Sequence, residues 1–390
     1  MHSFAQSPND PGFVQDPYQF YDRLRAAGDL AYWPDYDLIC ATSHRAVHAL
    51  LRDRRFGREI PAELARPVPE HLRPFYRIED HSMLELEAPR HTRLRGLVLR
   101  AFTSRRIAAL GPEIAALAHR LIDDMPQGDV DLLTAFCQPI PVIVIARLLG
   151  VPDDMAPQLL RWSNDMVALY QARRSRAIED AAASAAAEFA AFLEDYIAQR
   201  RNSPREDLLS QLIAAEEAGE RLSTDELIAT CVLLLNAGHE ATVHTLGNGI
   251  KALLETGTMI TTDTAAPITE EIMRFDPPLH LFTRYAYEDA DLYGHVFRRG
   301  DKVALMLGAA GRDPQVYAEP HRFDPTREAR PHLAFGGGAH FCVGAPLARL
   351  ELVTALPILF DRLPGLELAE PPRYADLYHF HGLERLMVRR

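Results

Sequence analysis

The stretch His332–Leu356, HLAFGGGAHFCVGAPLARLELVTAL, decides the fold of this chain. Three consecutive glycines, Gly336–Gly338, can adopt backbone conformations that other residues avoid, and they let a flat group approach the main chain. Cys342 follows them, and Pro346 at the start of the next helical pattern predicts that a helix begins there. The sequence therefore places Cys342 just before a helix N-terminus, where peptide N–H groups and the helix dipole stabilise a thiolate.

A lone cysteine in a glycine-rich turn is more often buried and inert than functional. Here the whole spacing Phe335-x-x-Gly338-x-x-x-Cys342-x-Gly344 is present, with a histidine two residues before the cysteine. This spacing resembles the haem-binding signature of the cytochrome P450 family. The resemblance implies a haem b whose iron is bound by the Cys342 thiolate. It also implies that Phe335, Gly336 and Gly344 lie against the cofactor.

Three further motifs extend the resemblance over nearly the whole chain. Glu271-Ile-Met-Arg274 matches the family's ExxR motif, and Pro320-His-Arg322-Phe323 matches its arginine-bearing segment. The resemblance implies a buried structural network of Glu271, Arg274 and Arg322, which is tolerable only when its charges are fully paired. His91-Thr-Arg93-Leu-Arg95 looks like the family's propionate-binding helix. Buried propionates need cationic or hydrogen-bonding partners, and the implied ligands are His91, Arg95, Arg284 and His340.

A long apolar helix is predicted from the capping box Ser223-Thr-Asp-Glu226 to about Glu255, and AGHEATVH (237–244) lies inside it. A zinc-protease motif needs histidines four residues apart, whereas His239 and His244 are five apart. We expect both histidines on the outer side of the helix.

The same stretch resembles the family's oxygen-binding groove, where Ala237 and Gly238 would leave room for O2 above the haem. The family usually continues with an acid and a threonine, but Ala241 follows Glu240 here. Thr242 comes one residue later, about 100° around the helix. The resemblance implies Glu240 and Thr242 as catalytic residues, with Ala241 facing the cofactor. Our hypothesis is that a substrate hydroxyl or an ordered water completes the proton relay.

The fold class follows from the distribution of patterns. Helical spacing dominates a chain of ordinary globular composition, 47% hydrophobic and 25% charged. Short strands are predicted around residues 38–42, 283–288 and 302–307, a surface loop over 60–80, and a helix with Ser203 as its N-cap. We expect one mainly α domain with a small β portion, residues 1–390. The resemblance places its haem between the long helix and the cysteine loop.

Composition excludes several classes of protein. The net charge of −12 argues against general nucleic-acid binding. Four widely separated cysteines form no disulfide framework. The sequence shows no signal-peptide pattern and no apolar stretch of membrane-spanning length. We therefore expect a cytoplasmic protein.

The resemblance implies a monooxygenase that inserts one oxygen atom from O2 into a small or medium organic substrate, by hydroxylation or oxidative dealkylation. Electrons would come from NAD(P)H through a ferredoxin or flavodoxin-type partner. The segment Arg90–Arg106 holds six arginines and no acidic residue, which suits an acidic partner. A solvated helix face is an almost equal explanation of this segment. The alternatives are a haem-binding sensor or a peroxide-driven variant, because Ala241 replaces the usual threonine.

The resemblance also implies a substrate pocket with a mixed lining. Histidines and tyrosines, including Tyr378 and His379, stand among its apolar residues and favour a substrate with polar groups. The implied pocket residues are Met83, Leu84, Leu233, Leu234, Leu279, His280, Phe282 and Phe380.

Overall fold

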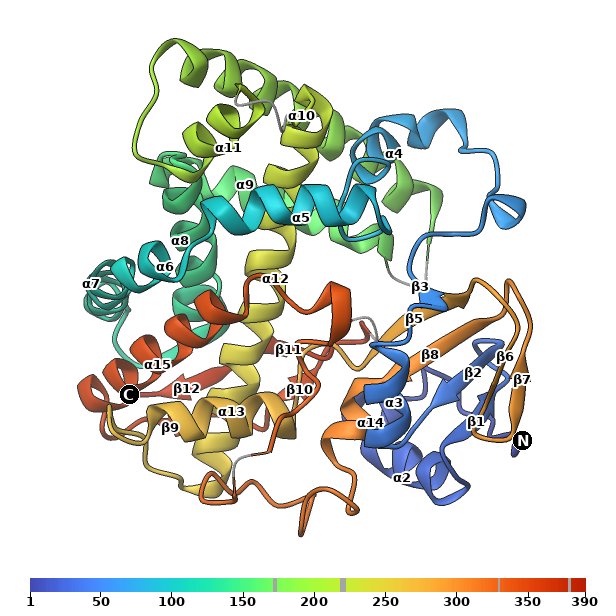
Figure 1. The fold of residues 1–390 in the computed structure, drawn as a ribbon. Coiled ribbons are helices and arrows are strands. Elements are labelled where there is room, and N and C mark those ends of the chain that lie inside the picture. The colour runs from blue at the N-terminus through green and yellow to red at the C-terminus, as the bar shows by residue number, and fades with distance from the viewer. Residues whose placement is uncertain (171–173, 218–221, 329, 378–379) are drawn as a thin grey trace. The chain divides into compact units, whose positions relative to one another are not determined.

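The computed structural model describes residues 1–170, 174–217, 222–328, 330–377 and 380–390 (Figure 1). The chain forms two compact units. The first contains Met1–Leu64, Ala115–Cys137 and Ala241–Arg390, and the second contains Ala65–Ile114 and Gln138–Glu240. The predicted mainly α fold with a small β portion is confirmed. The single domain stays a prediction.

A five-stranded sheet organises the first unit, in the order β1-β2-β8-β5-β3. Strand β2 pairs parallel with β8, whereas the β1–β2, β5–β8 and β3–β5 pairs are antiparallel. Strands from the N-terminal segment therefore lie beside strands from residues 281–306, as the blue and orange arrows of Figure 1 show. The strands are β1 (Leu30–Trp33), β2 (Leu38–Ala41), β3 (Phe56–Gly57), β5 (Leu281–Ala286) and β8 (Lys302–Met306).

Both faces of this sheet are buried, because alternate residues of a strand point to opposite faces. Val303 and Leu305 of β8 join a hydrophobic cluster with α3 (His44–Leu50). Their neighbours Ala304 and Met306 join another cluster with α2 (Tyr18–Ala26). The sheet thus holds α2 and α3 on opposite faces. This fixes the end of α3, against which the cysteine loop packs.

The first unit also contains helices and short strands outside this sheet. They are α1 (Pro11–Gln15), η1 (Ala62–Leu64), β4 (Asp129–Asp131), η3 (Leu133–Cys137), α13 (Ala265–Phe275), β6 (Ala290–Leu292), β7 (His295–Phe297), α14 (Leu307–Gly311), η6 (Gly338–His340), α15 (Ala345–Arg362), β9 (Glu367–Leu368), β10 (Arg373–Tyr374), β11 (Leu383–Arg385) and β12 (Met387–Arg389).

The second unit is helical, and α10 packs against α9 and α4. Its helices, including two that continue into the first unit, are η2 (Glu70–Leu72), α4 (Arg73–Glu79), α5 (Arg90–Ala101), α6 (Ser104–Ala109), α7 (Gly111–Asp123), α8 (Pro139–Leu149), η4 (Asp153–Met155), α9 (Ala156–Val167), η5 (Ala168–Tyr170), α10 (Arg176–Asn202), α11 (Leu208–Glu217) and α12 (Thr224–Thr256).

Two local predictions in this unit are wrong. The expected loop over residues 60–80 contains α4, which begins with Arg73-Pro74 and buries Phe75 and Ile78. Ser203 is the C-cap of α10 rather than an N-cap. The side chain of Asp207 instead accepts a 2.7 Å hydrogen bond from the Ser210 N–H at the start of α11. An acidic N-cap one turn further on therefore outcompetes the serine-proline signal.

Helix α12 confirms the predicted capping box. The Ser223 N–H donates to Glu226 Oε2 at 2.8 Å, and the Glu226 N–H donates to Ser223 Oγ at 3.2 Å. The helix continues without a break to Thr256, and residues 242–250 are all buried. Among the described residues, no helix is long and apolar enough to span a membrane.

Candidate active site

The cysteine loop is held in shape by its own backbone. The Cys342 N–H donates to the Phe335 carbonyl at 3.0 Å, and the Gly336 N–H donates to the Leu333 carbonyl at 2.8 Å. Gly336 and Gly338 have φ angles of +70° and +65°, a region that favours glycine. The helix predicted after the loop begins at Ala345, with Pro346 in its first turn.

Close packing against α3 also requires glycine in this loop. A Cβ at Gly338 would lie 2.2 Å from the Leu51 carbonyl oxygen, and one at Gly337 would lie 2.9 Å from Arg52 Nη1. Because Leu51 is the C-cap of α3, the sheet and its helix set the position of the loop. Of the glycines predicted to admit a flat group, Gly338 is thus also needed for packing, because the atom that its Cβ would meet is backbone.

Cys342 differs from the other three cysteines in exposure. Cys40, Cys137 and Cys231 are buried, and burial raises the thiol pKa values of Cys40 and Cys231 to about 12 and that of Cys137 well above its usual range. Cys342 is half-buried and lies three residues before α15. Of the four thiols, Cys342 alone combines solvent access with a helix N-terminus, which is what a thiolate ligand requires.

An ion-pair group supports the loop from α13 and α15. Arg349 Nε donates to Glu270 Oε1 at 2.5 Å, and its guanidinium stacks 4.6 Å from the Phe335 ring centroid. Burial raises the pKa of Glu270, but hydrogen bonds from Arg349 and His332 outweigh it and lower that pKa to about 2. Glu270 therefore stays ionised and fixes Arg349 against Phe335. The sequence analysis missed this group because its members lie on separate helices.

The network around Glu271 requires a correction. Arg274 donates to both carboxylate oxygens of Glu271 at 2.7 Å, as predicted. The third arginine, however, is Arg327, whose Nε lies 3.2 Å from Glu271 Oε1. The Arg322 side chain is 62% exposed and pairs with Glu319. Only its backbone carbonyl joins the network, accepting from Arg274 at 3.2 Å.

The four proposed propionate ligands are distributed over both units. Arg284 on β5 is 3% exposed, and His340 ends η6 in the cysteine loop. His91 on α5 is 3% exposed, and Arg95 is half-buried one helical turn later. Arg284 and His91 are buried basic side chains of the type that haem propionates require.

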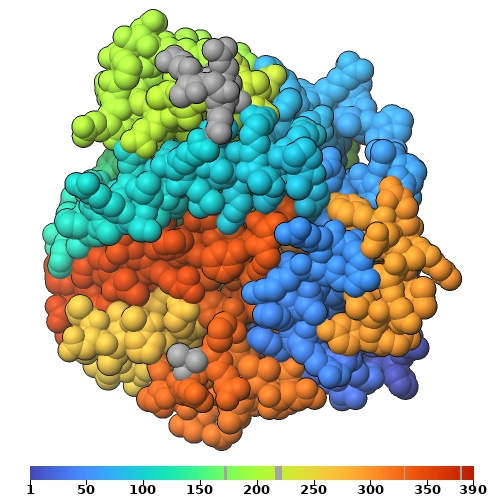
Figure 2. Space-filling model, viewed as in Figure 1, coloured from blue at the N-terminus to red at the C-terminus, as the bar shows by residue number. Residues whose placement is uncertain are grey.

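The basic segment from Arg90 to Arg106 is partly neutralised. Arg93 forms an ion pair with Glu226, Arg106 donates to Gln211 at 2.6 Å, and Arg90 donates to the Asp80 carbonyl at 2.6 Å. Arg100 and Arg105 are exposed, and Figure 2 shows this teal segment at the surface. The exposed arginines of the segment are Arg90, Arg93, Arg100 and Arg105, and of these Arg93 is paired with an acidic side chain.

Helix α12 carries a narrow open stripe in an otherwise buried stretch. Ala237 is exposed, and Gly238 and Ala241 are half-buried. Leu233, one turn earlier, is also half-buried. Small side chains at this spacing on one helical face leave room for a flat group, as the resemblance implies. A Cβ at Gly238 would meet Ile145 at an ordinary 3.5 Å, so packing against α8 does not require that glycine.

The prediction that His239 and His244 lie on the outer side of the helix is wrong. His239 is fully buried, with Nδ1 3.3 Å from Ser163 Oγ and Nε2 3.1 Å from Glu240 Oε2. His244 is 9% exposed, and a Cβ at Gly382 would lie 1.8 Å from its Nδ1. Glu240 is 18% exposed and Thr242 is buried. Helical geometry gave the relative directions of these side chains but not their exposure, because α12 is covered on most sides.

The predicted pocket residues fall into three groups. Leu84, Leu233, Leu279, Phe282 and Phe380 are half-buried, whereas Met83 and Leu234 are each 6% exposed. His280 is fully buried, and its two ring nitrogens lie 2.8 Å and 3.3 Å from the hydroxyls of Tyr21 and Tyr18. The His280 side chain therefore does not line the predicted pocket. Tyr378 and His379 lie outside the described residues.

Comparisons with known proteins agree with this geometry. A model of the family "Cytochrome P450" matches residues 266–364. The biotin biosynthesis cytochrome P450 of Bacillus subtilis (strain 168) is 34% identical over 99% of both chains. Cytochrome P450 monooxygenase PikC of Streptomyces venezuelae is 37% identical over 97% of this chain and 92% of its own.

Solved structures give the same result. The chain is similar to P450BioI, crystallised with an acyl carrier protein ligated to hexadec-9Z-enoic acid. The TM-score is 0.91 at 33% identity, covering 97% of this chain and 99% of that one. The CalO2 structure gives a TM-score of 0.90 at 30% identity over 99% and 98%. The chain belongs to the cytochrome P450 family and is an oxidoreductase.

Proposed function

We propose that this chain is a haem-thiolate monooxygenase that inserts one oxygen atom from O2 into an organic substrate, by hydroxylation or oxidative dealkylation. The observation that carries the proposal is the half-buried Cys342 on a glycine-fixed loop before α15. The bound haem b would supply O2 activation.

The chain's own residues would hold this cofactor. Cys342 would bind the iron as a thiolate, stabilised by the N–H groups that open α15. Phe335, Gly336 and Gly344 would lie against the ring, and His91, Arg95, Arg284 and His340 would bind the propionates. Arg284 and His91 support this assignment because they are buried side chains with N–H groups that can donate to a propionate.

The open stripe on α12 supports a binding groove for O2 at Ala237, Gly238 and Ala241. Glu240 would hold protons for delivery, with Thr242 as a second hydroxyl on the same helix. Because position 241 carries no hydroxyl, we propose that a substrate hydroxyl or an ordered water completes the relay. Ala241→Thr should therefore change both the coupling of NAD(P)H use to product and the site of oxidation. Unchanged values of both would contradict this relay.

The substrate proposed is a medium-sized organic molecule with a substantial apolar part. The supporting observation is that, among the candidate lining residues that the structure describes, the half-buried ones are leucine and phenylalanine. Relatives named for biotin biosynthesis and polyketide biosynthesis agree with this class. An acyl chain is the first candidate to test for a shift of the haem spin state.

Electrons would arrive from NAD(P)H through a ferredoxin or flavodoxin-type protein at the exposed basic residues. Arg100 and Arg105 are proposed because both side chains are exposed at the end of the basic segment. Reversal of both charges should raise the apparent KM for the reductant several-fold at low salt and leave kcat largely unchanged. The matched control is Arg201→Glu on α10. An unchanged apparent KM for the reductant would contradict docking of the electron donor at these residues.

A turnover experiment distinguishes this function from the alternatives. The purified protein is supplied with NADH, a surrogate ferredoxin couple, candidate substrates and isotopically labelled O2. A monooxygenase forms a product that carries one labelled oxygen atom. Product formed only with added hydrogen peroxide would identify the peroxide-driven variant. Spin-state shifts without any product would identify a sensor.

A further inference from the structure

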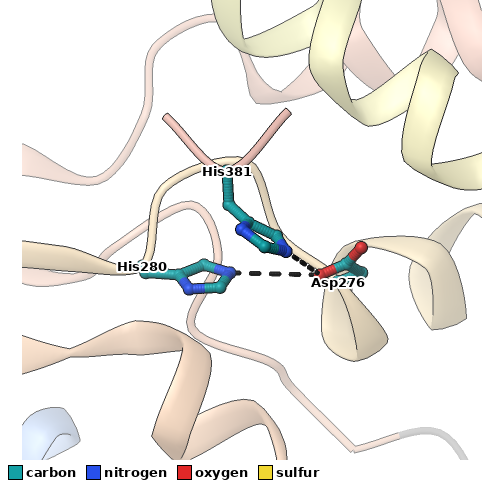
Figure 3. A group of neighbouring side chains, drawn as sticks. All are labelled: Asp276, His280 and His381. Carbon is teal, nitrogen blue, oxygen red and sulfur yellow. Dashed lines mark ion pairs between the residues drawn. The ribbon is translucent and has the colours of Figure 1, made fainter. Parts of the chain in front are cut away.

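A cluster of buried donor side chains lies apart from the residues assigned to the haem. Asp276, His280 and His381 each place one ligand atom within 4.8 Å of the others (Figure 3). Their side chains are at most 7% exposed. They come from the end of α13, the residue before β5 and the C-terminal segment. Segments distant in the sequence therefore converge on one point.

The Tyr18 hydroxyl on α2 supplies a fourth donor. It lies 2.6 Å from Asp276 Oδ1 and 3.3 Å from His280 Nε2. Asp276 Oδ1 lies 3.5 Å from His381 Nε2 and 4.0 Å from His280 Nε2. A tetrahedral ion with bonds of about 2.0–2.1 Å keeps its ligands about 3.3 Å apart. These four of the six separations lie on both sides of that value, and the ligand atoms of the two histidines lie within 4.8 Å of each other.

Both histidine rings are deeply buried, and burial favours the neutral imidazole. Burial is the largest cause that lowers the pKa values of His280 and His381 well below their usual range. Neutral imidazole is the form that binds metals. His381 is 5% exposed, yet its Nε2 lies 3.5 Å from Asp276 Oδ1, longer than an ordinary N–H···O hydrogen bond.

Further hydrogen bonds orient the donors from outside. The Tyr21 hydroxyl lies 2.8 Å from His280 Nδ1, and the Tyr374 hydroxyl donates to Asp276 Oδ2 at 2.5 Å. The Tyr374 ring also stacks on His381 with centroids 3.8 Å apart. Such outer partners are typical of metal ligands, because they fix the tautomer and the ring direction. With these outer partners in place, His280 Nε2 and Asp276 Oδ1 face the centre of the donor cluster.

The positive charge of Arg312 lies beside the cluster and disfavours the binding of a cation there. Its guanidinium lies 3.3 Å from the centroid of the Tyr18 ring, and its Nε and Nη2 donate to the Phe275 carbonyl at 3.0 and 2.8 Å. Burial and the Asp276 carboxylate raise the pKa of Tyr18 well above its usual range, so a bound ion would itself have to displace the Tyr18 proton. A divalent ion is then balanced by the Asp276 carboxylate and the resulting tyrosinate, with one proton released.

We propose that Asp276, His280, His381 and Tyr18 form a closed, four-coordinate zinc site that fastens α2 and the C-terminal segment to the end of α13. Two imidazoles and a coordination number of four favour Zn²⁺ over Mg²⁺ or Ca²⁺, which take more oxygen ligands. The absence of an open position makes the site structural rather than catalytic.

The first test measures zinc directly in the haem-loaded protein. The protein is produced in zinc-supplemented medium, dialysed against EDTA and analysed by mass spectrometry and zinc-edge X-ray absorption, which does not detect iron. We expect about one zinc ion per chain, with nitrogen and oxygen ligands at about 2.0–2.1 Å. Less than about a tenth of an ion per chain would show that the cluster is only a hydrogen-bond network, and would overturn the proposal.

The second test removes the ligands against a matched control. His280→Gln and His381→Gln should each lose most of the zinc, with folding checked by circular dichroism. His44 and His48 form a stacked pair on α3, with ring centroids 6.0 Å apart, and are the main surface competitors for zinc. The double variant His44→Gln/His48→Gln should keep its zinc. Zinc lost from this control but kept by the cluster variants would mean adventitious surface binding.

Discussion

At the scale of single residues, the network around Glu271 shows how burial decides the role of an arginine. Glu271 is 4% exposed and accepts hydrogen bonds from Arg274, Arg327 and the Asp324 N–H. The Arg327 side chain is 14% exposed and also donates to the Ala318 carbonyl at 2.7 Å. Removing a partner from a buried charge strongly lowers the free energy of unfolding, whereas removing an exposed ion pair changes it little.

Arg327→Ala should therefore destabilise the protein, and Arg322→Ala is its matched control. We expect a loss of about 2 kcal/mol in the free energy of unfolding for Arg327→Ala, because it removes a charge-assisted hydrogen bond from a buried carboxylate. Arg322→Ala should stay within about 0.5 kcal/mol. Urea unfolding followed by circular dichroism measures both. Equal effects of the two variants would contradict the assignment of Arg327.

At the scale of elements, helix α12 depends on its capping box. Ser223→Ala removes the acceptor for the Glu226 N–H and should cost about 1 kcal/mol. Ser203→Ala is the control, since Ser203 closes α10 through its backbone N–H. It should change stability by less than about 0.5 kcal/mol. A loss in the Ser203 variant as large as that in the Ser223 variant would contradict the cap assignment.

At the scale of the whole molecule, stability should fall with acid. The folded-state pKa values of His280 and His381 are well below the unfolded value of 6.5. Below about pH 6.5 the unfolded chain takes up protons that the folded chain does not, so stability is present above this pH and is lost below it. The charged and titratable groups that face the two rings are Tyr18, Tyr21, His244, Lys251, Asp276, Arg312 and Tyr374.

The size of this effect follows from proton linkage. Each histidine contributes about 1.4 kcal/mol per pH unit between about pH 5 and 6. Glu351 acts in the opposite direction, because burial raises its pKa well above 4.5 and the folded chain keeps that proton. In protein without bound zinc, His280→Gln should therefore reduce the slope of unfolding free energy against pH by up to about 1.4 kcal/mol per unit. Urea titrations at several pH values measure this slope. An unchanged slope in the variant would contradict the claim that His280 is neutral in the folded protein.

The sequence predicts those parts of the site whose residues are close together in the chain. The cysteine loop and the capping box depend on spacings of a few residues, and the structure has both. The third arginine was misassigned because Arg322 and Arg327 are five residues apart and only burial distinguishes them. Glu270 with Arg349, and His280 with His381, come together through the tertiary fold. No local spacing could have paired them.

The measurement that tests the central proposal most directly is the absorption spectrum of the dithionite-reduced protein with carbon monoxide. We expect a Soret band at the position of thiolate-ligated haem in the wild type and in the control Cys40→Ala, whose buried thiol has a pKa of about 12. Cys342→Ser should lose this band while the circular dichroism stays that of a folded protein. A wild-type spectrum without the thiolate band, or a Cys342→Ser spectrum that retains it, would contradict Cys342 as the iron ligand.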